Sequence, residues 1–254
     1  MKAPLSRLIV WALVCCFPGG IVLARTPVRK SKKKTPAVEQ EAEAVAKPSA
    51  TPVPEEDDDS GGGKAAPNAT IQSGQIVEFS GELPRVKKLI ESALVLTTLN
   101  LTYAYGSDDP ANGGMDCSGF ISYVLRQNGF SEVPRNASGQ YAWLRKAGTF
   151  RAVLSRNSHT FELDELRPGD LLFWTGTYAT ENDPPVTHSM IYLGTEKGTN
   201  NRIMAGSSDG RLYHGKSRWG VSVFDFYLNG SSNVSGSANH PVFVGYARPP
   251  GLRD

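Results

Sequence analysis

The sequence has little of what metal, nucleotide or nucleic-acid sites require. Its four histidines are scattered and, together with three cysteines, show no spacing typical of metal ligands. The glycine run at 61–63 precedes no helix signal, so it does not predict a phosphate-binding loop. The net charge of +2, from 27 basic and 25 acidic residues, is too small to indicate a nucleic-acid partner. We therefore expect no metal, no cofactor and no nucleic acid.

Cysteine is also scarce, and two of the three cysteines, Cys15 and Cys16, lie near the start of the chain. If an export signal is removed there, Cys117 becomes the only cysteine of the mature protein. A lone thiol in an exported protein can form no internal disulfide and is open to oxidation. We therefore expect Cys117 to have a chemical function.

The first 24 residues are typical of such a signal. Lys2 and Arg7 form a basic start, an apolar stretch follows, and Val22 and Ala24 supply small residues at the usual cleavage spacing. We predict a signal peptide over 1–24 and export to the periplasm or cell envelope. An uncleaved anchor is the alternative, since the apolar stretch is at the short limit for spanning a bilayer.

Residues 25–68 predict a disordered linker. Few large apolar side chains occur there, so the segment cannot bury enough surface to offset its ordering entropy. Its basic block at 25–34 could bind anionic wall polymers or a membrane surface; a solvated linker is the alternative. Proline and glycine near its end favour an extended spacer.

Residues 69–254 predict one folded domain. Helical spacing of apolar residues indicates helices over 85–101, after Pro84, and over 117–129, before a terminal glycine. Short apolar runs predict strands over 170–174, 190–193, 221–226 and 242–247. Segments 175–187 and 229–241 are predicted loops. This order indicates an α+β fold, with a helix packed on a mostly antiparallel sheet.

The segment GGMDCSGFISYVL places Cys117 at the start of the second helix. Free backbone amides and the positive end of the helix dipole favour an anion there, so they would stabilise the thiolate. Asp116 and Ser118 are suited to cap the first turn. A buried structural cysteine is the alternative for this motif alone.

A thiol nucleophile also needs an acid–base partner within hydrogen-bonding reach. His188 begins the apolar run HSMIYLG, in which a strand would hold its ring on a fixed scaffold. An isolated histidine at a strand start is commonly structural. Together with the lone cysteine, it indicates a Cys–His dyad.

Four blocks occur in order along the chain: YAYG at 103–106, DCSGF at 116–120, PGDLLFW at 168–174 and HSMIYLG at 188–194. With them, the sequence resembles the NlpC/p60 family of cell-wall cysteine peptidases over roughly residues 84–249. The resemblance implies a papain-like fold with Cys117 as nucleophile and His188 as base. It also implies hydrolysis of amide bonds in peptidoglycan stem peptides, commonly between D-glutamate and a diamino acid.

Further roles follow from the same resemblance. Tyr103 matches a tyrosine that lines the substrate site, with Tyr105 as its competitor. Asp116 and Ser118 flank the nucleophile, and we assign them to substrate binding in a supporting role.

The third catalytic position departs from the family pattern. Met204 stands where the family usually has a polar residue, most often histidine, and a thioether accepts hydrogen bonds weakly. Ser208 would share a strand face with Met204, and we assign it as the third catalytic residue. Asp209, His214, a backbone carbonyl or an impaired enzyme are the alternatives.

The sequence thus predicts a secreted, monomeric cysteine endopeptidase acting on peptidoglycan stem peptides, with the loop 176–185 overhanging its groove. Two alternatives come from other classes. One is a catalytically impaired peptidoglycan-binding module, and the other is a Cys–His acyltransferase or amidase acting on another substrate.

Overall fold

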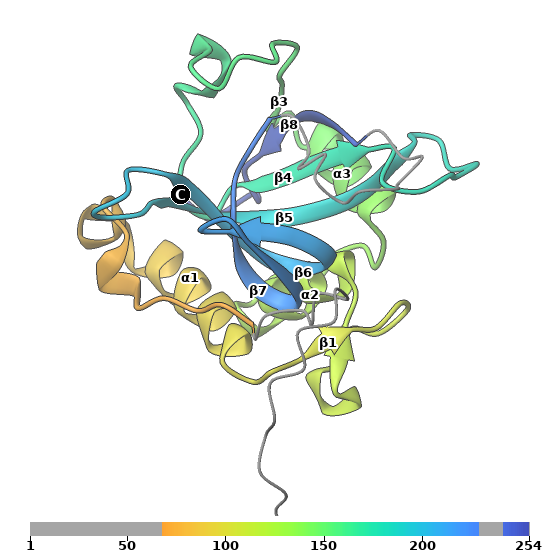
Figure 1. Ribbon diagram of the computed structural model, residues 1–254. Coiled ribbons are helices and arrows are strands. Elements are labelled where there is room, and N and C mark those ends of the chain that lie inside the picture. Colours follow the sequence, from red (N-terminus) through yellow and green to blue (C-terminus); the bar gives the residue numbers. More distant parts are fainter. Residues whose placement is uncertain (1–67, 229–240, 254) are drawn as a thin grey trace, which may run out of the picture. The chain divides into compact units, whose positions relative to one another are not determined.

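The computed structural model describes residues 68–228 and 241–253 (Figure 1). The predicted signal peptide, nearly all of the linker and most of the loop 229–241 lie outside these residues. Asn68, the last residue assigned to the linker, donates a hydrogen bond from Nδ2 to Leu101 O at 2.9 Å. The next residue, Ala69, is buried in the core. Within the described part of the chain, no helix is long and apolar enough to cross a membrane.

The described helices and strands follow the chain in a helix-first order. The α-helices are α1 (Pro84–Thr97), α2 (Cys117–Gln127) and α3 (Ala137–Lys146). The strands are β1 (Thr102–Tyr103), β2 (Gly114–Met115), β3 (Phe150–Ala152), β4 (Leu171–Thr175), β5 (Val186–Thr195), β6 (Arg202–Tyr213), β7 (Lys216–Asp225) and β8 (Val242–Ala247). Four short 3-10 turns lie between them at Ser73–Gln75, Phe79–Gly81, Pro110–Asn112 and Phe161–Leu163.

Six strands form one sheet in the order β3-β8-β4-β5-β6-β7, and every neighbouring pair is antiparallel. β1 and β2 form a separate, two-residue parallel pair. The α+β prediction with a mostly antiparallel sheet is therefore confirmed.

Both faces of this sheet are buried. On one face, Phe173 and Ile191 belong to the same apolar cluster as Phe120 of α2 and Leu89 of α1, and these helices lie together against β5, β6 and β7 (Figure 1). On the other face, alternate strand residues including Trp174 form a second cluster. Because strand side chains alternate, the two clusters use opposite sets of positions.

The apolar patterns located most of these elements. The predicted first helix ends at Thr97 instead of residue 101, and the predicted strand at 190–193 is the centre of the longer β5. No residue pattern predicted α3 or the full length of β6, whose AGSSDG segment is typical of a loop. Gly206 in that segment allows close packing, because a Cβ there would lie 2.9 Å from Cγ of Met190 on the neighbouring strand and Met190 would have to shift.

Candidate active site

Cys117 is the first residue of α2, as the sequence predicts. Asp116 is the N-cap: its backbone is extended, and its Oδ1 accepts a hydrogen bond from Gly119 N at 2.6 Å. The Asp116 carbonyl accepts from Phe120 N at 3.0 Å. These bonds leave the amides of Cys117 and Ser118, at the first turn, without a partner inside the helix.

Asp116 also fixes the segments around the helix start. Its Oδ2 accepts from Gly106 N and from the Arg135 guanidinium, both at 2.8 Å, and its Oδ1 accepts from Ser118 Oγ at 3.1 Å. The carboxylate therefore joins the YAYG block, α2 and the segment before α3. The structure gives Asp116 and Ser118 a positioning role, and their contact with substrate stays a prediction.

The Cys117 side chain lies against the strand that carries His188. Sγ is 3.9 Å from the carbonyl oxygen of Thr187, and the side chain is buried. The amide of Ser189 also points to the sulfur. The sulfur therefore lies beside the backbone on both sides of His188.

Gln140, a buried residue of α3, bridges the two elements of the site. Its Nε2 donates to Ser118 O at 2.9 Å, and its Oε1 accepts from Ser189 Oγ at 2.8 Å. Its segment, ASGQYAWLRK, carries no signal that would identify it from sequence.

The His188 imidazole lies on the Trp174 side of the sheet. The two residues pair across β4 and β5, and their ring centroids are 5.8 Å apart. His188 is buried, and its Nε2 has no hydrogen-bond partner in the described part of the chain. No hydrogen bond joins the imidazole to Cys117 Sγ in this structure, and catalytic hydrogen bonds are often looser in a site without substrate.

Burial leaves both groups neutral. It raises the pKa of the Cys117 thiol to about 11, against the opposing effect of the amides of Ser189 and Ser118. Burial, followed by the nearby positive charge of Arg211, lowers the pKa of His188 well below its usual value. The amide of Ser118 at the helix start does favour the thiolate, as the sequence predicts, but desolvation outweighs it and the thiol pKa rises.

Two tyrosines lie close enough to Cys117 for its charge to affect their pKa values. Burial raises the pKa of Tyr103, and the next largest contribution comes from Cys117. Tyr105 is 82% exposed, so Tyr103 is the better placed of the two to line the site. Burial followed by the charge of Cys117 also raises the pKa of Tyr178, which brings the loop 176–185 to this site.

The residues considered for the third catalytic position, next to Cys117 and His188, lie in different parts of the structure. Met204 is buried in the second apolar cluster. Ser208 is buried farther along β6, and Asp209 beside it is exposed. His214 lies elsewhere, with Nε2 2.7 Å from Oε2 of Glu196, so the structure does not bring it to His188.

Arg211 is a site residue that the sequence analysis missed. The pairing of β6 with β7 shifts between Ser208 and Arg211, from Ser208↔Gly220 to Arg211↔Arg218. One extra residue in β6 therefore moves Arg211 to the face that Ser208 occupies. Strict alternation would have placed it on the opposite face, and no local signal marks the bulge.

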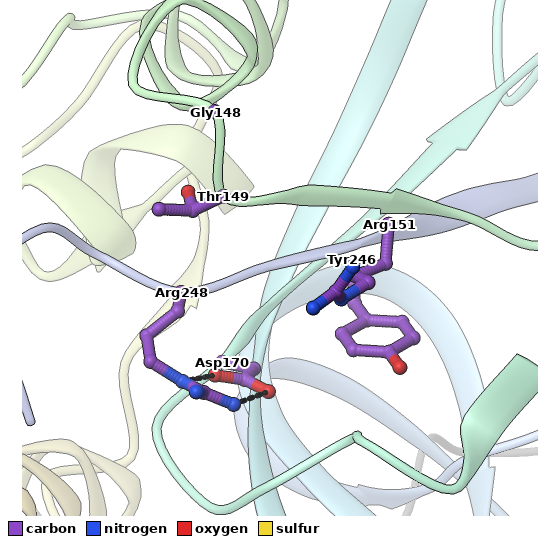
Figure 2. Close-up of a pocket in the computed structure, with 6 residues that line it drawn as sticks. All are labelled: Gly148, Thr149, Arg151, Asp170, Tyr246 and Arg248. Atoms are coloured by element: carbon purple, nitrogen blue, oxygen red, sulfur yellow. Dashed lines mark hydrogen bonds and ion pairs between the residues drawn. The ribbon is translucent and has the colours of Figure 1, made fainter.

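A pocket elsewhere in the domain is separate from this site. It is lined by Arg151, Asp170, Arg248 and three neighbours, and Figure 2 shows Asp170 and Arg248 joined directly. Asp170 precedes β4, whereas Trp174, the partner of His188, lies near the other end of that strand. Within the described ranges, no group of three or more histidine, cysteine or acidic side chains could hold a metal ion.

The fold and the site define an α+β domain with a cysteine at a helix start beside a strand histidine. Residues 100–218 match the model of the NlpC/P60 family. This part of the chain is therefore an NlpC/P60 family region, in agreement with the resemblance of the four sequence blocks.

Two curated relatives are similar to part of the chain. It is 30% identical over 96 residues to the Gamma-DL-glutamyl hydrolase of Bacillus subtilis (strain 168), a match that covers 38% of this chain and 19% of the relative. It is 30% identical over 131 residues to the Probable endopeptidase p60 of Listeria seeligeri, covering 50% of this chain and 20% of the relative. The chain therefore matches about a fifth of the length of these relatives.

A solved structure from Staphylococcus aureus subsp. aureus Mu50, described as similar to a lipoprotein of the NLP/P60 family, is 23% identical to this chain. The match covers 66% of this chain and 42% of the other, with a TM-score of 0.42.

Proposed function

We propose that this chain is an exported cysteine endopeptidase that hydrolyses amide bonds in peptidoglycan stem peptides, with Cys117 as nucleophile and His188 as base. The observation that supports it most is the buried Cys117 sulfur at the start of α2, beside the backbone that flanks His188. The names of the two relatives, a hydrolase and an endopeptidase, support the reaction class. The bond between D-glutamate and a diamino acid is the proposed target.

The neutral resting state sets the order of the proton transfers. Neutral His188 accepts the thiol proton as Cys117 Sγ attacks the amide carbonyl. The amides of Cys117 and Ser118 stabilise the oxyanion, since Asp116 already occupies those of Gly119 and Phe120. The imidazolium then protonates the leaving amine, and water releases the acyl group from the enzyme.

Ser208 is the proposed group that orients His188. β5 and β6 pair as Ile191↔Ala205, and continuing this antiparallel register by three residues brings Ser208 opposite His188. Residues opposite each other in a ladder share a face, so the hydroxyl would be directed to the imidazole side.

Defined muropeptides test the proposal. The purified chain should release products cut after D-glutamate, identified by mass spectrometry, and Cys117→Ala and His188→Ala should each reduce turnover at least a thousandfold, on the order seen for active-site nucleophiles and bases. Thermal unfolding of both variants checks the fold. Cleavage that persists in Cys117→Ala would show that the nucleophile is another residue.

A binding module without turnover is the second candidate. It is favoured by His188 Nε2, which has no hydrogen-bond partner among the described residues, and by Met204, which lies in the apolar cluster and cannot orient the imidazole. Saturable binding of muropeptides by the unmodified chain, without products, would establish it. An acyltransferase would instead give amine adducts when an acceptor amine is added.

A further inference from the structure

Arg211 is a buried cation with no ion pair to a carboxylate in the described part of the chain. Only 8% of the residue is exposed, and the guanidinium lies 4.6 Å from the centre of the Trp174 ring. In the described part of the chain, no carboxylate or carbonyl accepts a hydrogen bond from it. The nearest acidic neighbour along the chain, Asp209, is exposed; its charge favours the protonated form of Arg211, but no ion pair joins the two side chains.

Two arginines that are only partly buried do have carboxylate acceptors. Arg135 pairs with Asp116 at 2.8 Å, and Arg248 pairs with the buried Asp170 at 3.1 Å. Burying a charge without an acceptor is costly, so an arginine held in this way is suited to an anion that arrives from outside the chain.

The position of Arg211 identifies where that anion would bind. The bulge in β6 turns its side chain to the Trp174 face, where the His188 ring lies. Its charge also acts on both Cys117 and His188. An anion on Arg211 would therefore belong to the molecule whose amide Cys117 attacks.

We propose that Arg211 determines specificity by binding a free carboxylate of the substrate next to the scissile amide. The inference rests on the proposed function and narrows its substrate class. A γ-linked glutamyl residue is cut at its side-chain carbonyl and keeps its α-carboxylate nearby, whereas the α-carboxamide form is neutral and of similar shape. Arginine binds carboxylates through two parallel hydrogen bonds, which a carboxamide cannot reproduce.

Two peptides that differ only in this group, α-carboxylate or α-carboxamide, test the proposal. Their affinities are measured by calorimetry on the full chain carrying Cys117→Ala, and their kcat/KM on the chain with Cys117. We expect both measures to favour the carboxylate by about tenfold or more, as for hydrogen bonds between charged groups.

Three variants assign this preference to the guanidinium. Arg211→Gln should bring the ratio between the peptides to within about twofold of unity, while Arg211→Lys should retain part of it. Arg202→Gln is the control: Arg202 lies on the same strand, but its guanidinium donates a hydrogen bond to Ser158 O. This variant should leave the ratio between the two peptides unchanged. Retained binding of the carboxamide peptide by Arg211→Gln shows that the site is folded.

A ratio near one in the unmodified chain would overturn the proposal. So would an unchanged ratio in Arg211→Gln, or an equal loss for both peptides, because a guanidinium that acts on the oxyanion or only supports the fold would serve both alike. Failure of the proposed function would give a different combination of binding and cleavage results. In that case the carboxylate is bound selectively but not cleaved, whereas cleavage without selectivity defeats only the inference about Arg211.

Discussion

At the scale of single residues, the proposed mechanism depends on two groups whose pKa values move in opposite directions. Burial raises that of Cys117 to about 11 and lowers that of His188. A thiolate–imidazolium pair would require the reverse order, with the thiol more acidic than the imidazolium. In the proposed dyad both groups are therefore neutral at rest, and proton transfer would accompany attack on the substrate.

The raised pKa of Cys117 predicts how its thiol reacts with iodoacetamide. Only the thiolate is alkylated, so a pKa of about 11 means that the rate should rise about tenfold per pH unit from about pH 7 to about pH 10. Mass spectrometry of the peptide containing Cys117 follows the rate without interference from Cys15 and Cys16. In guanidinium, where the thiol is exposed, the rise should level off above about pH 9. A rate already flat near pH 7 in the native chain would instead reveal a thiolate formed at rest.

Ser208 can be tested against its two competitors. If its hydroxyl orients His188, Ser208→Ala should lower kcat about tenfold or more with little change in KM, since ground-state binding is untouched. Asp209→Ala should change kcat by less than about threefold, and so should His214→Ala, whose imidazole pairs with Glu196. If all three variants retain activity, a backbone group must orient the ring.

The residue-level predictions succeeded where a local pattern was sufficient. The position of Cys117 at a helix start and the capping role of Asp116 were both evident from the sequence. Arg211 was not, because a single extra residue in β6 reverses the alternation of side chains and leaves no compositional trace. The partners of Asp116 and Ser118 from the α3 region, Arg135 and Gln140, depend on tertiary packing alone.

At the scale of elements, the proposed site requires α2 to pack closely against the loop that follows the YAYG block. A Cβ at Gly119 would lie 2.1 Å from Ser107 O and 2.9 Å from Cα of Asp108. Alanine at a helical glycine would gain up to about 1 kcal/mol from helix propensity. Because the clash is with backbone, the cost of about 1–3 kcal/mol expected for overpacking should exceed that gain.

Gly119→Ala should therefore lower both stability and activity. We expect a net loss of about 1–2 kcal/mol in the free energy of unfolding, measured by urea titration, and a fall in kcat/KM as Tyr103 and Cys117 separate. The matched control is Gly81→Ala, where a Cβ has no atom within 4 Å. Stabilisation by Gly119→Ala would mean that the loop can move away without affecting the helix.

The loop 176–185 is held at both ends. Thr177 donates from N and Oγ1 to Thr187 Oγ1 at 3.1 and 2.8 Å, and Ser138 Oγ donates to Pro184 O at 2.8 Å. Replacing residues 179–182 by two glycines keeps both attachments and Tyr178. We expect less than about 1 kcal/mol loss of stability, as for surface segments, but a changed ranking of stem peptides by kcat/KM. A large drop in melting temperature with the ranking preserved would give the loop a structural role only.

The packing of α2 on the sheet, and not any single element, brings Cys117 beside the backbone that flanks His188. Periodicity located α1, α2, β4 and β8 to within a few residues, because each buries one regular face or a continuous apolar run. It could not give the order β3-β8-β4-β5-β6-β7, which places the last strand of the chain between two earlier ones. Short-range patterns carry no information on such pairings, and here the family resemblance supplied the fold.

At the scale of the whole molecule, export decides whether the domain can meet peptidoglycan. If residues 1–24 direct translocation, the full chain should be recovered from the envelope fraction of expressing bacteria, and its first residue by sequencing should be Arg25. A chain lacking 1–24 should stay in the cytoplasm, while Cys117→Ala should be exported like the parent. An envelope protein that still begins at Met1 would support the anchor alternative. Equal cytoplasmic recovery of all three would refute export, because a wall peptidase confined there has no access to cross-linked substrate.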